Sequence, residues 1–376
     1  MKTGIRTKPA IKGLFIICAI LTALGVGRIA FPRTASAGSF FNPFLPLQVS
    51  TIPGNGDINP YGLAFVPFGF PSSGALTPGQ ILVSNFNNTT TQGLGTTIIS
   101  INPSSGNTAL FFQGSSPIGF TNALTIARTG LIFGGSLPTS GGTPEPGPLY
   151  VFDPNGNVVT QLGSSDLVDG PWGMALNDRG TTGQLFISNI FNPSGSFDGT
   201  ITRLDVTLSP GSITVLKATT IASGYTSHAD TAGVVVGPAG LAYDSHRDIL
   251  YVAAEGDDAI YALNGAGHAT GSLGKGQLIY SDENILHGPL GLIIAPNGNL
   301  ITANADPATF LPTADTSEII ELTRSGSLVR EFSIDPNAGS AFAIAVANKG
   351  PINQFAYVDD FVSSCTIWNL PLSGLF

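Results

Sequence analysis

Charged residues and cysteine are scarce in this chain. Only 10% of its 376 residues are Asp, Glu, Lys or Arg, and it has two cysteines and four histidines. Cys18 lies in an N-terminal segment that we expect to be removed. Cys365 would then be the sole cysteine of the mature chain, which excludes an intrachain disulfide there.

Helical periodicity and a serine-hydrolase motif are also missing. Outside the first residues, no stretch keeps a 3.6-residue apolar period, so we expect almost no helix. No G-x-S-x-G sequence occurs, which removes the usual signature of an α/β-hydrolase nucleophile. What the chain does have is 48 Gly, 27 Pro and 42% hydrophobic residues in short regular runs, a pattern typical of a turn-rich β protein.

The first 37 residues have the pattern of a secretory signal peptide. A basic start is followed by the uncharged apolar run 13–27 and then by Ala35-Ser36-Ala37. That run is shorter than the roughly 20 residues needed to span a bilayer, so we expect cleavage near Gly38 rather than a membrane anchor. The mature protein is then secreted, periplasmic or extracellular. Loss of the segment's six Lys and Arg changes the net charge from −9 to −15, which argues against binding nucleic acid.

A repeated pattern of three short strands organises the rest of the chain. Its clearest copy is PAGLAYD, ILYVAA and AIYAL within residues 238–263, and similar copies begin near residues 60, 171 and 289. Aligning the first strands places a small residue in register in six copies, at Gly62, Ala123, Gly173, Gly240, Gly291 and Ala343. We expect these positions to be small because inner strands crowd together around an axis.

Six such repeats predict an all-β, six-bladed β-propeller of four-stranded blades in a single domain, residues 38–376. The predicted blades are 60–113, 117–163, 171–222, 238–281, 289–334 and 341–370. The last repeat lacks a fourth strand, and the N-terminal segment 47–52, LQVSTI, lacks a partner. We therefore predict that 47–52 pairs with CTIWNL of the last blade, closes the ring and removes two free sheet edges.

The repeat, PxGLA followed by G-x-LYV-[SA]-[ND], resembles the NHL-repeat propellers and the related gluconolactonase-like and strictosidine-synthase-like six-bladed propellers. The resemblance covers residues 60–370. Blade 2 departs from it with NALTIA, and blade 6 with AFAIA. Gluconolactonase-like propellers hold a divalent metal with Asn, Asp and Glu side chains at one mouth of the channel, so the resemblance implies a metal-dependent hydrolase as one possible activity.

Polar residues end five of the six second strands, on the face where the first strands begin. We predict that they rim one mouth of the channel as ligand-binding residues; they are Asn85, Asn189, Glu255, Asn304 and Asp359. Two interpretations stay open. Such oxygens suit Ca²⁺ or another divalent cation, with Glu255, Asp359, Asn189 and Asn304 as the ligands. Alternatively, each side chain caps a turn by bonding to backbone N–H groups.

Candidates for a general base lie in the loops of the same face. A histidine beside a carboxylate can activate water, which makes His228, Asp230 and His287 the catalytic candidates. Solvated loop positions are the alternative, since none of them falls in a known motif. Cys365 is expected to be a buried, inert thiol. Long, nearly uncharged loops over blades 1, 2, 3 and 5, the last being 305–317, suggest a groove that is open over blades 4 and 6. The alternative is that these are surface loops whose length and sequence vary without a function.

The sequence therefore predicts a secreted, monomeric propeller whose channel mouth binds a small molecule, glycan or protein segment without catalysis. The first alternative is a divalent-metal-dependent hydrolase of lactones or esters that uses the same mouth. The second is a structural protein of an envelope or matrix. The fold alone does not choose between them.

Overall fold

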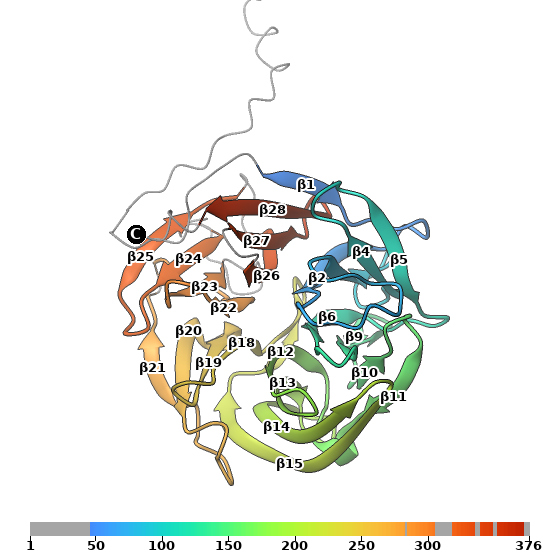
Figure 1. Cartoon of the computed structure of the whole chain (residues 1–376). Coiled ribbons are helices and arrows are strands. Elements are labelled where there is room, and N and C mark those ends of the chain that lie inside the picture. Colours follow the sequence, from blue (N-terminus) through green and yellow to red (C-terminus); the bar gives the residue numbers. More distant parts are fainter. Residues whose placement is uncertain (1–45, 283, 305–317, 335–338, 349–351, 372–376) are drawn as a thin grey trace, which may run out of the picture.

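The protein is a ring of six antiparallel sheets arranged as blades around a central axis (Figure 1). The computed structural model describes residues 46–282, 284–304, 318–334, 339–348 and 352–371. Within these ranges the only helical segments are two 3₁₀ turns, η1 (Ser164–Asp166) and η2 (Glu255–Asp257), and no helix is long and apolar enough to cross a membrane. The predicted all-β, six-bladed propeller is confirmed.

Each of the first five blades is built from four strands that follow one another along the chain. Blade 1 contains β2 (Ile58–Phe65), β3 (Ile81–Asn87), β4 (Thr97–Ile101) and β5 (Thr108–Gln113). Blade 2 contains β6 (Phe120–Ile126), β7 (Ile132–Ser136), β10 (Leu149–Phe152) and β11 (Val158–Leu162), with the small hairpin β8 (Thr139–Ser140) and β9 (Thr143–Pro144) between its second and third strands.

Blade 3 has the longest strands: β12 (Pro171–Asp178), β13 (Thr182–Phe191), β14 (Phe197–Ser209) and β15 (Ser212–Tyr225). A second hairpin, β16 (His228–Asp230) and β17 (Val234–Val236), leads into blade 4. Blade 4 contains β18 (Pro238–Asp244), β19 (Ile249–Ala254), β20 (Ala259–Asn264) and β21 (Gln277–Tyr280). Blade 5 contains β22 (Leu292–Ile294), β23 (Leu300–Ala303), β24 (Ile319–Leu322) and β25 (Leu328–Phe332).

Blade 6 joins the two ends of the chain. Its strands β26 (Ala341–Asn348), β27 (Ile352–Asp359) and β28 (Ser364–Pro371) come from the C-terminal end, and β1 (Leu47–Ser50) from the N-terminal end supplies the fourth. β1 pairs antiparallel with β28, with Leu47 opposite Ile367 and Val49 opposite Cys365. The predicted closure of the ring by the N-terminal strand is confirmed, and Figure 1 shows β1 along the outer side of β28.

The small residues of the inner strands lie where neighbouring blades touch. A Cβ atom on Gly173 would lie 2.0 Å from the carbonyl oxygen of Ala239, and one on Gly240 would lie 2.2 Å from that of Leu290. The amide of Gly240 also donates a 2.9 Å hydrogen bond to the Leu290 carbonyl, which links blade 4 to blade 5. The expectation that a side chain would collide with the next blade is correct.

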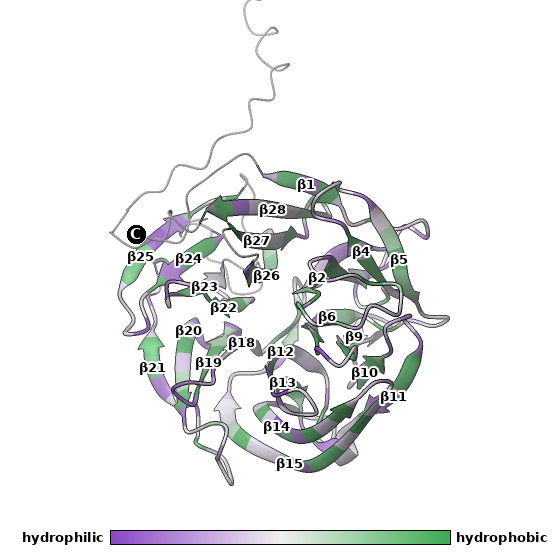
Figure 2. Cartoon of the chain, in the orientation of Figure 1, coloured by the Kyte–Doolittle hydropathy of each residue, from purple (hydrophilic) through white to green (hydrophobic). Residues whose placement is uncertain are grey.

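Burial follows from position in the blade. All seven residues of β3 are buried, because a second strand is covered by a blade on each side, whereas β5 at the outer edge is mostly exposed and buries only Phe111. In Figure 2 the middle strands β4 and β10 are accordingly green, while the outer strands β5 and β25 are banded. Cys365 lies at 0% exposure in this core, and burial raises the pKa of its thiol, as expected for an inert cysteine.

Candidate functional site

The predicted rim lies on one face of the ring. The beginning of each inner strand pairs with the end of the second strand, for example Pro171 with Asn189 and Pro238 with Ala254. The five predicted rim residues are therefore near the same mouth of the channel. Their exposed fractions range from 0% to 4%, so their side chains are buried among the strands and loops of this face.

The asparagines of the rim hold the loop that enters their own blade. Asn189 Oδ1 accepts a 3.1 Å hydrogen bond from the amide of Asp169, and its Nδ2 donates to the carbonyl of Leu167. Asn304 does the same with the amide of His287, at 2.8 Å, and the carbonyl of Ile285. These contacts match the alternative in which the polar residue caps a turn.

Two further blades have a related contact. Asn85 Nδ2 donates to the carbonyl of Thr51, which anchors the segment that follows β1. In blade 2 the role falls to Ser136, whose hydroxyl donates a 2.7 Å hydrogen bond to the carbonyl of Ile118. The common function of these side chains is to fasten each outer-to-inner connection to the sheet that it enters.

The two carboxylates of the predicted rim also bond to nearby backbone. Glu255 is in η2, and its Oε2 accepts a 3.3 Å hydrogen bond from Gly237, whereas Asp359 Oδ1 accepts one of 3.1 Å from Val362. No group of three or more His, Cys, Asp or Glu side chains that could hold a metal ion occurs among the described residues. These hydrogen bonds give the two carboxylates a structural role as turn caps. Their roles as ligands or rim contacts stay predictions.

The predicted catalytic residues belong to two segments, the β16–β17 hairpin and the loop that leads into blade 5. His228 and Asp230 are on β16, where His228 Nδ1 lies 2.9 Å from the carbonyl of Ala229 and Asp230 Oδ1 accepts from the amide of Ala232 at the hairpin turn. His287 is 1% exposed, in the loop that Asn304 fastens. The catalytic role of the three residues stays a prediction.

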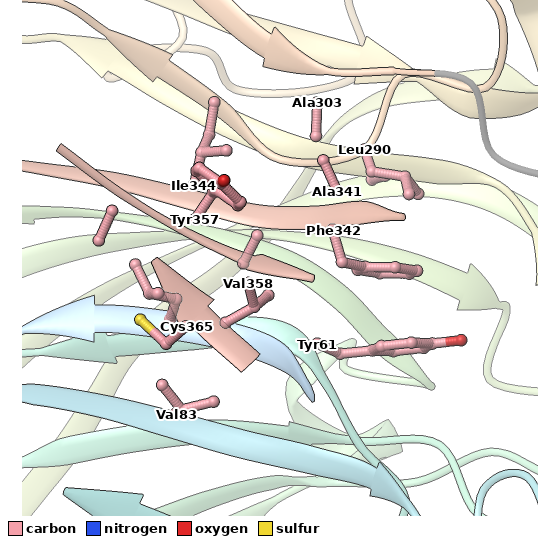
Figure 3. Close-up of a cluster of buried hydrophobic side chains, with 14 of the residues drawn as sticks. Tyr61, Val83, Leu290, Ala303, Ala341, Phe342, Ile344, Tyr357, Val358 and Cys365 are labelled. Atoms are coloured by element: carbon pink, nitrogen blue, oxygen red, sulfur yellow. The ribbon is translucent and has the colours of Figure 1, made fainter. Parts of the chain in front are cut away.

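A cluster of aromatic rings closes the axis at this face, which the sequence reasoning missed. Tyr61 stacks on Phe342 with ring centroids 3.6 Å apart, and Figure 3 shows the two rings lying parallel. Trp172, from blade 3, meets both edge-on at 5.8 and 6.1 Å, and Phe86 stacks on Tyr61 at 4.4 Å. Since blades 1, 3 and 6 contribute, these four residues, which we call the axial plug, pack across the channel.

The sequence does contain a signal for the axial plug. The residue immediately before each small register residue is Tyr61, Asn122, Trp172, Ala239, Leu290 and Phe342. Five of the six are buried in the same hydrophobic cluster, and Asn122 is the exception. One position of the repeat thus determines what fills the axis.

The β16–β17 hairpin covers the axial plug from outside. Val234 and Val235 belong to the same hydrophobic cluster as Tyr61 and Trp172. At its tip, the carbonyl of Ala232 accepts a 3.0 Å hydrogen bond from Gln92 Nε2 of blade 1, so the hairpin reaches across the face. A groove open over blade 4 was therefore a wrong expectation, because the connection into that blade crosses the mouth. Loop 305–317 lies outside the described residues.

A cavity of about 350 Å³ remains at this mouth, beside the hairpin tip. Tyr61 of the axial plug lines it together with the side chains of Asn59, Asn87, Gln92, Asp360 and Phe361. The backbone N–H of Asn59 donates a 3.2 Å hydrogen bond to Ser363 Oγ, whereas its side-chain amide makes no hydrogen bond with the described residues. Phe361 is 67% exposed. We call this cavity the mouth pocket; it offers amides, a carboxylate and an exposed aromatic face to a ligand.

The comparisons with known proteins agree on the fold. No protein-family model matches the sequence, and no curated protein sequence is significantly similar to it. Among solved structures, a gluconolactonase from Xanthomonas campestris is 13% identical with a TM-score of 0.55, and covers 90% of this chain and 94% of its own. Regucalcin, a calcium-binding protein from Agrobacterium tumefaciens, is 13% identical with a TM-score of 0.52, and covers 85% and 92%.

A similar fold also occurs outside these proteins. A chain of the mitotic checkpoint complex is 11% identical with a TM-score of 0.51, and covers 89% of this chain and 98% of its own. The chain is therefore a six-bladed β-propeller similar in fold to gluconolactonase and regucalcin, as the resemblance of its repeats predicts. At these identities the likeness defines the fold, and the activity has to be argued from the site.

Proposed function

We propose that the protein is an exported, non-catalytic binding protein that takes a glycan in the mouth pocket. The observation that carries this proposal is the composition of the pocket, which combines three amide side chains with an exposed phenylalanine above the axial plug. Amides donate and accept hydrogen bonds and so match sugar hydroxyls, while an exposed aromatic ring covers the apolar face of a sugar. A volume of about 350 Å³ is within the range of small-molecule sites.

The absence of a strong charge in the pocket supports an uncharged ligand. Asp360 is the one lining residue with a side chain that is charged at neutral pH, so a highly charged ligand would lose its hydration without a matching partner. A monomer is sufficient for this function, since all lining residues belong to one chain.

Export follows from the signal-like segment 1–37, which lies outside the described residues; mass spectrometry of the mature protein should find an N-terminus at or near Gly38.

Calorimetric titration with linear trisaccharides tests the proposal. The panel is cellotriose, maltotriose and chitotriose, and at least one of them should bind with saturation. Phe361→Ala should weaken that binding about tenfold, since an aromatic contact residue contributes more than about 1 kcal/mol. Phe68→Ala is the matched control, because Phe68 is 59% exposed in the β2–β3 loop on the opposite face. Equal affinities for the two variants, or no binding by the panel, would exclude the mouth pocket.

A metal-dependent hydrolase is the second candidate, and the comparisons favour it because a gluconolactonase shares the fold over 90% of this chain. In this alternative Asp360, the carboxylate of the mouth pocket, is the general base that activates a water molecule. Hydrolysis of lactone or ester substrates should stop in Asp360→Asn and in the presence of a chelator. Binding without catalysis predicts instead that Asp360→Asn lowers affinity modestly and that a chelator has no effect.

A further inference from the structure

A second cavity occupies the axis on the other side of the axial plug. Its volume is about 360 Å³, and it is lined by inner strands from all six blades. The lining residues run from the small register positions toward the ends of the strands, for example Gly240 to Tyr243 and Gly291 to Ile294. We call it the axial chamber; it extends toward the face opposite the mouth pocket.

The wall of the axial chamber exposes polar groups but no charged side chain. None of the side chains that line it is charged. Each inner strand has a partner on one side only, so its free edge presents backbone N–H and C=O groups to the axis. Such groups need hydrogen-bond partners, and an apolar molecule in the chamber would leave them unsatisfied.

Blade 2 gives this chamber its side-chain polarity. The lining side chains that carry polar atoms are Asn122, Thr125 and Tyr243. Tyr243 is already engaged, because its hydroxyl donates a 2.8 Å hydrogen bond to Asp248. The side chains of Asn122 and Thr125 make no hydrogen bond with the described residues, and both lie on the inner strand β6.

These two residues are the ones at which blade 2 departs from the repeat. Asn122 takes the position that carries Tyr61 or Trp172 in other blades, and Thr125 takes the position of Ala64 or Ala242. Both side chains are half-buried, so in the absence of a ligand their polar atoms are hydrated by water in the chamber. The departure NALT therefore places two side chains that can still form hydrogen bonds, those of Asn122 and Thr125, on one side of the axial chamber.

We propose that the axial chamber binds an uncharged polyol of monosaccharide size, which Asn122 and Thr125 orient. The hydroxyl groups of such a molecule can both donate to and accept from the strand edges, and its volume suits a cavity of about 360 Å³. A charged analogue is excluded because the chamber has no side chain of opposite charge to replace the lost hydration. This site is separate from the mouth pocket and does not depend on the function proposed there.

Saturation-transfer NMR with myo-inositol and with D-glucose tests this proposal, with myo-inositol 1-phosphate as the charged analogue. The parent should bind at least one of the uncharged molecules and not the phosphate. Asn122→Leu should weaken binding at least about tenfold, and the nearly isosteric Thr125→Val should also weaken it. Thr160→Val, on the outer strand β11 of the same blade, is the matched control and should bind like the parent.

Two further comparisons separate the chamber from the mouth pocket and from unfolding. Phe361→Ala should leave myo-inositol binding unchanged, and circular dichroism should show that Thr125→Val melts like the parent. Unchanged binding in both Asn122→Leu and Thr125→Val, equal binding of the phosphate, or no binding of either uncharged molecule would overturn the proposal.

Discussion

Substituting Gly240 with alanine tests how the blades meet. A Cβ atom there would lie 2.2 Å from the Leu290 carbonyl oxygen and 2.5 Å from the Leu292 amide nitrogen. Non-bonded atoms prefer about 3.5–4.0 Å, so the inner strands of blades 4 and 5 would have to separate by roughly 1 Å. Because both contacts are backbone atoms, no side-chain rotation can relieve them.

The expected cost combines two contributions. Overpacking in a well-packed core costs about 1–3 kcal/mol, and weakening the hydrogen bond from Gly240 to Leu290 costs about another 1 kcal/mol. Gly240→Ala should therefore lower the free energy of unfolding by about 3 kcal/mol, measured by equilibrium denaturation in urea with the slope checked for two-state behaviour. Gly271→Ala is the control, since nothing lies within 4 Å of its Cβ position, and it should change stability by less than about 1 kcal/mol.

A loss smaller than about 1 kcal/mol in Gly240→Ala, or equal losses in the two variants, would refute the reasoning. The register of small residues would then reflect something other than contact between blades.

Three further predictions concern the closure, the buried carboxylates and acid stability. Deleting residues 38–53 removes β1 and exposes the edge of β28, so the melting temperature should fall sharply; a small change would contradict closure of the ring. Glu255→Gln and Asp359→Asn keep an acceptor oxygen for the hydrogen bonds from the backbone, so each should alter the free energy of unfolding by less than about 1 kcal/mol. Calcium should not shift the melting temperature of the parent or of either variant; a calcium-dependent shift in the parent that both variants lose would instead support a calcium site at these residues. Burial alone would raise the pKa of Asp248, but hydrogen bonds from His268, Gly267 and Tyr243 hold this pKa below its usual 3.8. The ionised Asp248 therefore stabilises the folded state above pH 3.8, and this contribution is lost as the pH falls through the folded-state pKa. Asp248→Asn should flatten the acid side of the stability profile, and an unchanged profile would contradict this assignment.

The repeat pattern was sufficient to predict the fold because one physical constraint recurs six times. Inner strands need a small residue where blades meet, and Gly173 and Gly240 show the close contact that requires it. The unpaired strand 47–52 could be assigned to the last blade because a missing strand and a spare strand complement each other. The structure limits its pairing to Leu47–Ser50.

The site was harder to predict because residue type does not determine direction. Asn189 and Asn304 end their strands at the predicted face, yet their amides turn inward to fasten a loop. The axial plug depends on Trp172 reaching rings from blades 1 and 6, a contact between residues far apart in sequence. The position before each register residue was visible in the sequence, but only the closed ring shows that it faces the axis.

The role of the β16–β17 hairpin could not be inferred from composition. Its sequence reads as one more connecting loop, and its position depends on Val234 and Val235 packing on the axial plug and on the hydrogen bond from Gln92 to Ala232. These contacts join the entrance of blade 4 to blade 1. They convert an open channel mouth into a bounded pocket.

The fate of a bound trisaccharide tests the central claim most directly. The exported protein would be incubated with the trisaccharide that it binds best, with and without a chelator, and the sugar recovered and analysed by mass spectrometry. Binding without catalysis predicts that the ligand is recovered intact at full yield in both conditions and that calorimetry shows heat only until saturation. Shorter sugars that accumulate with time, and that disappear when the chelator is present, would contradict the account and establish a metal-dependent hydrolase.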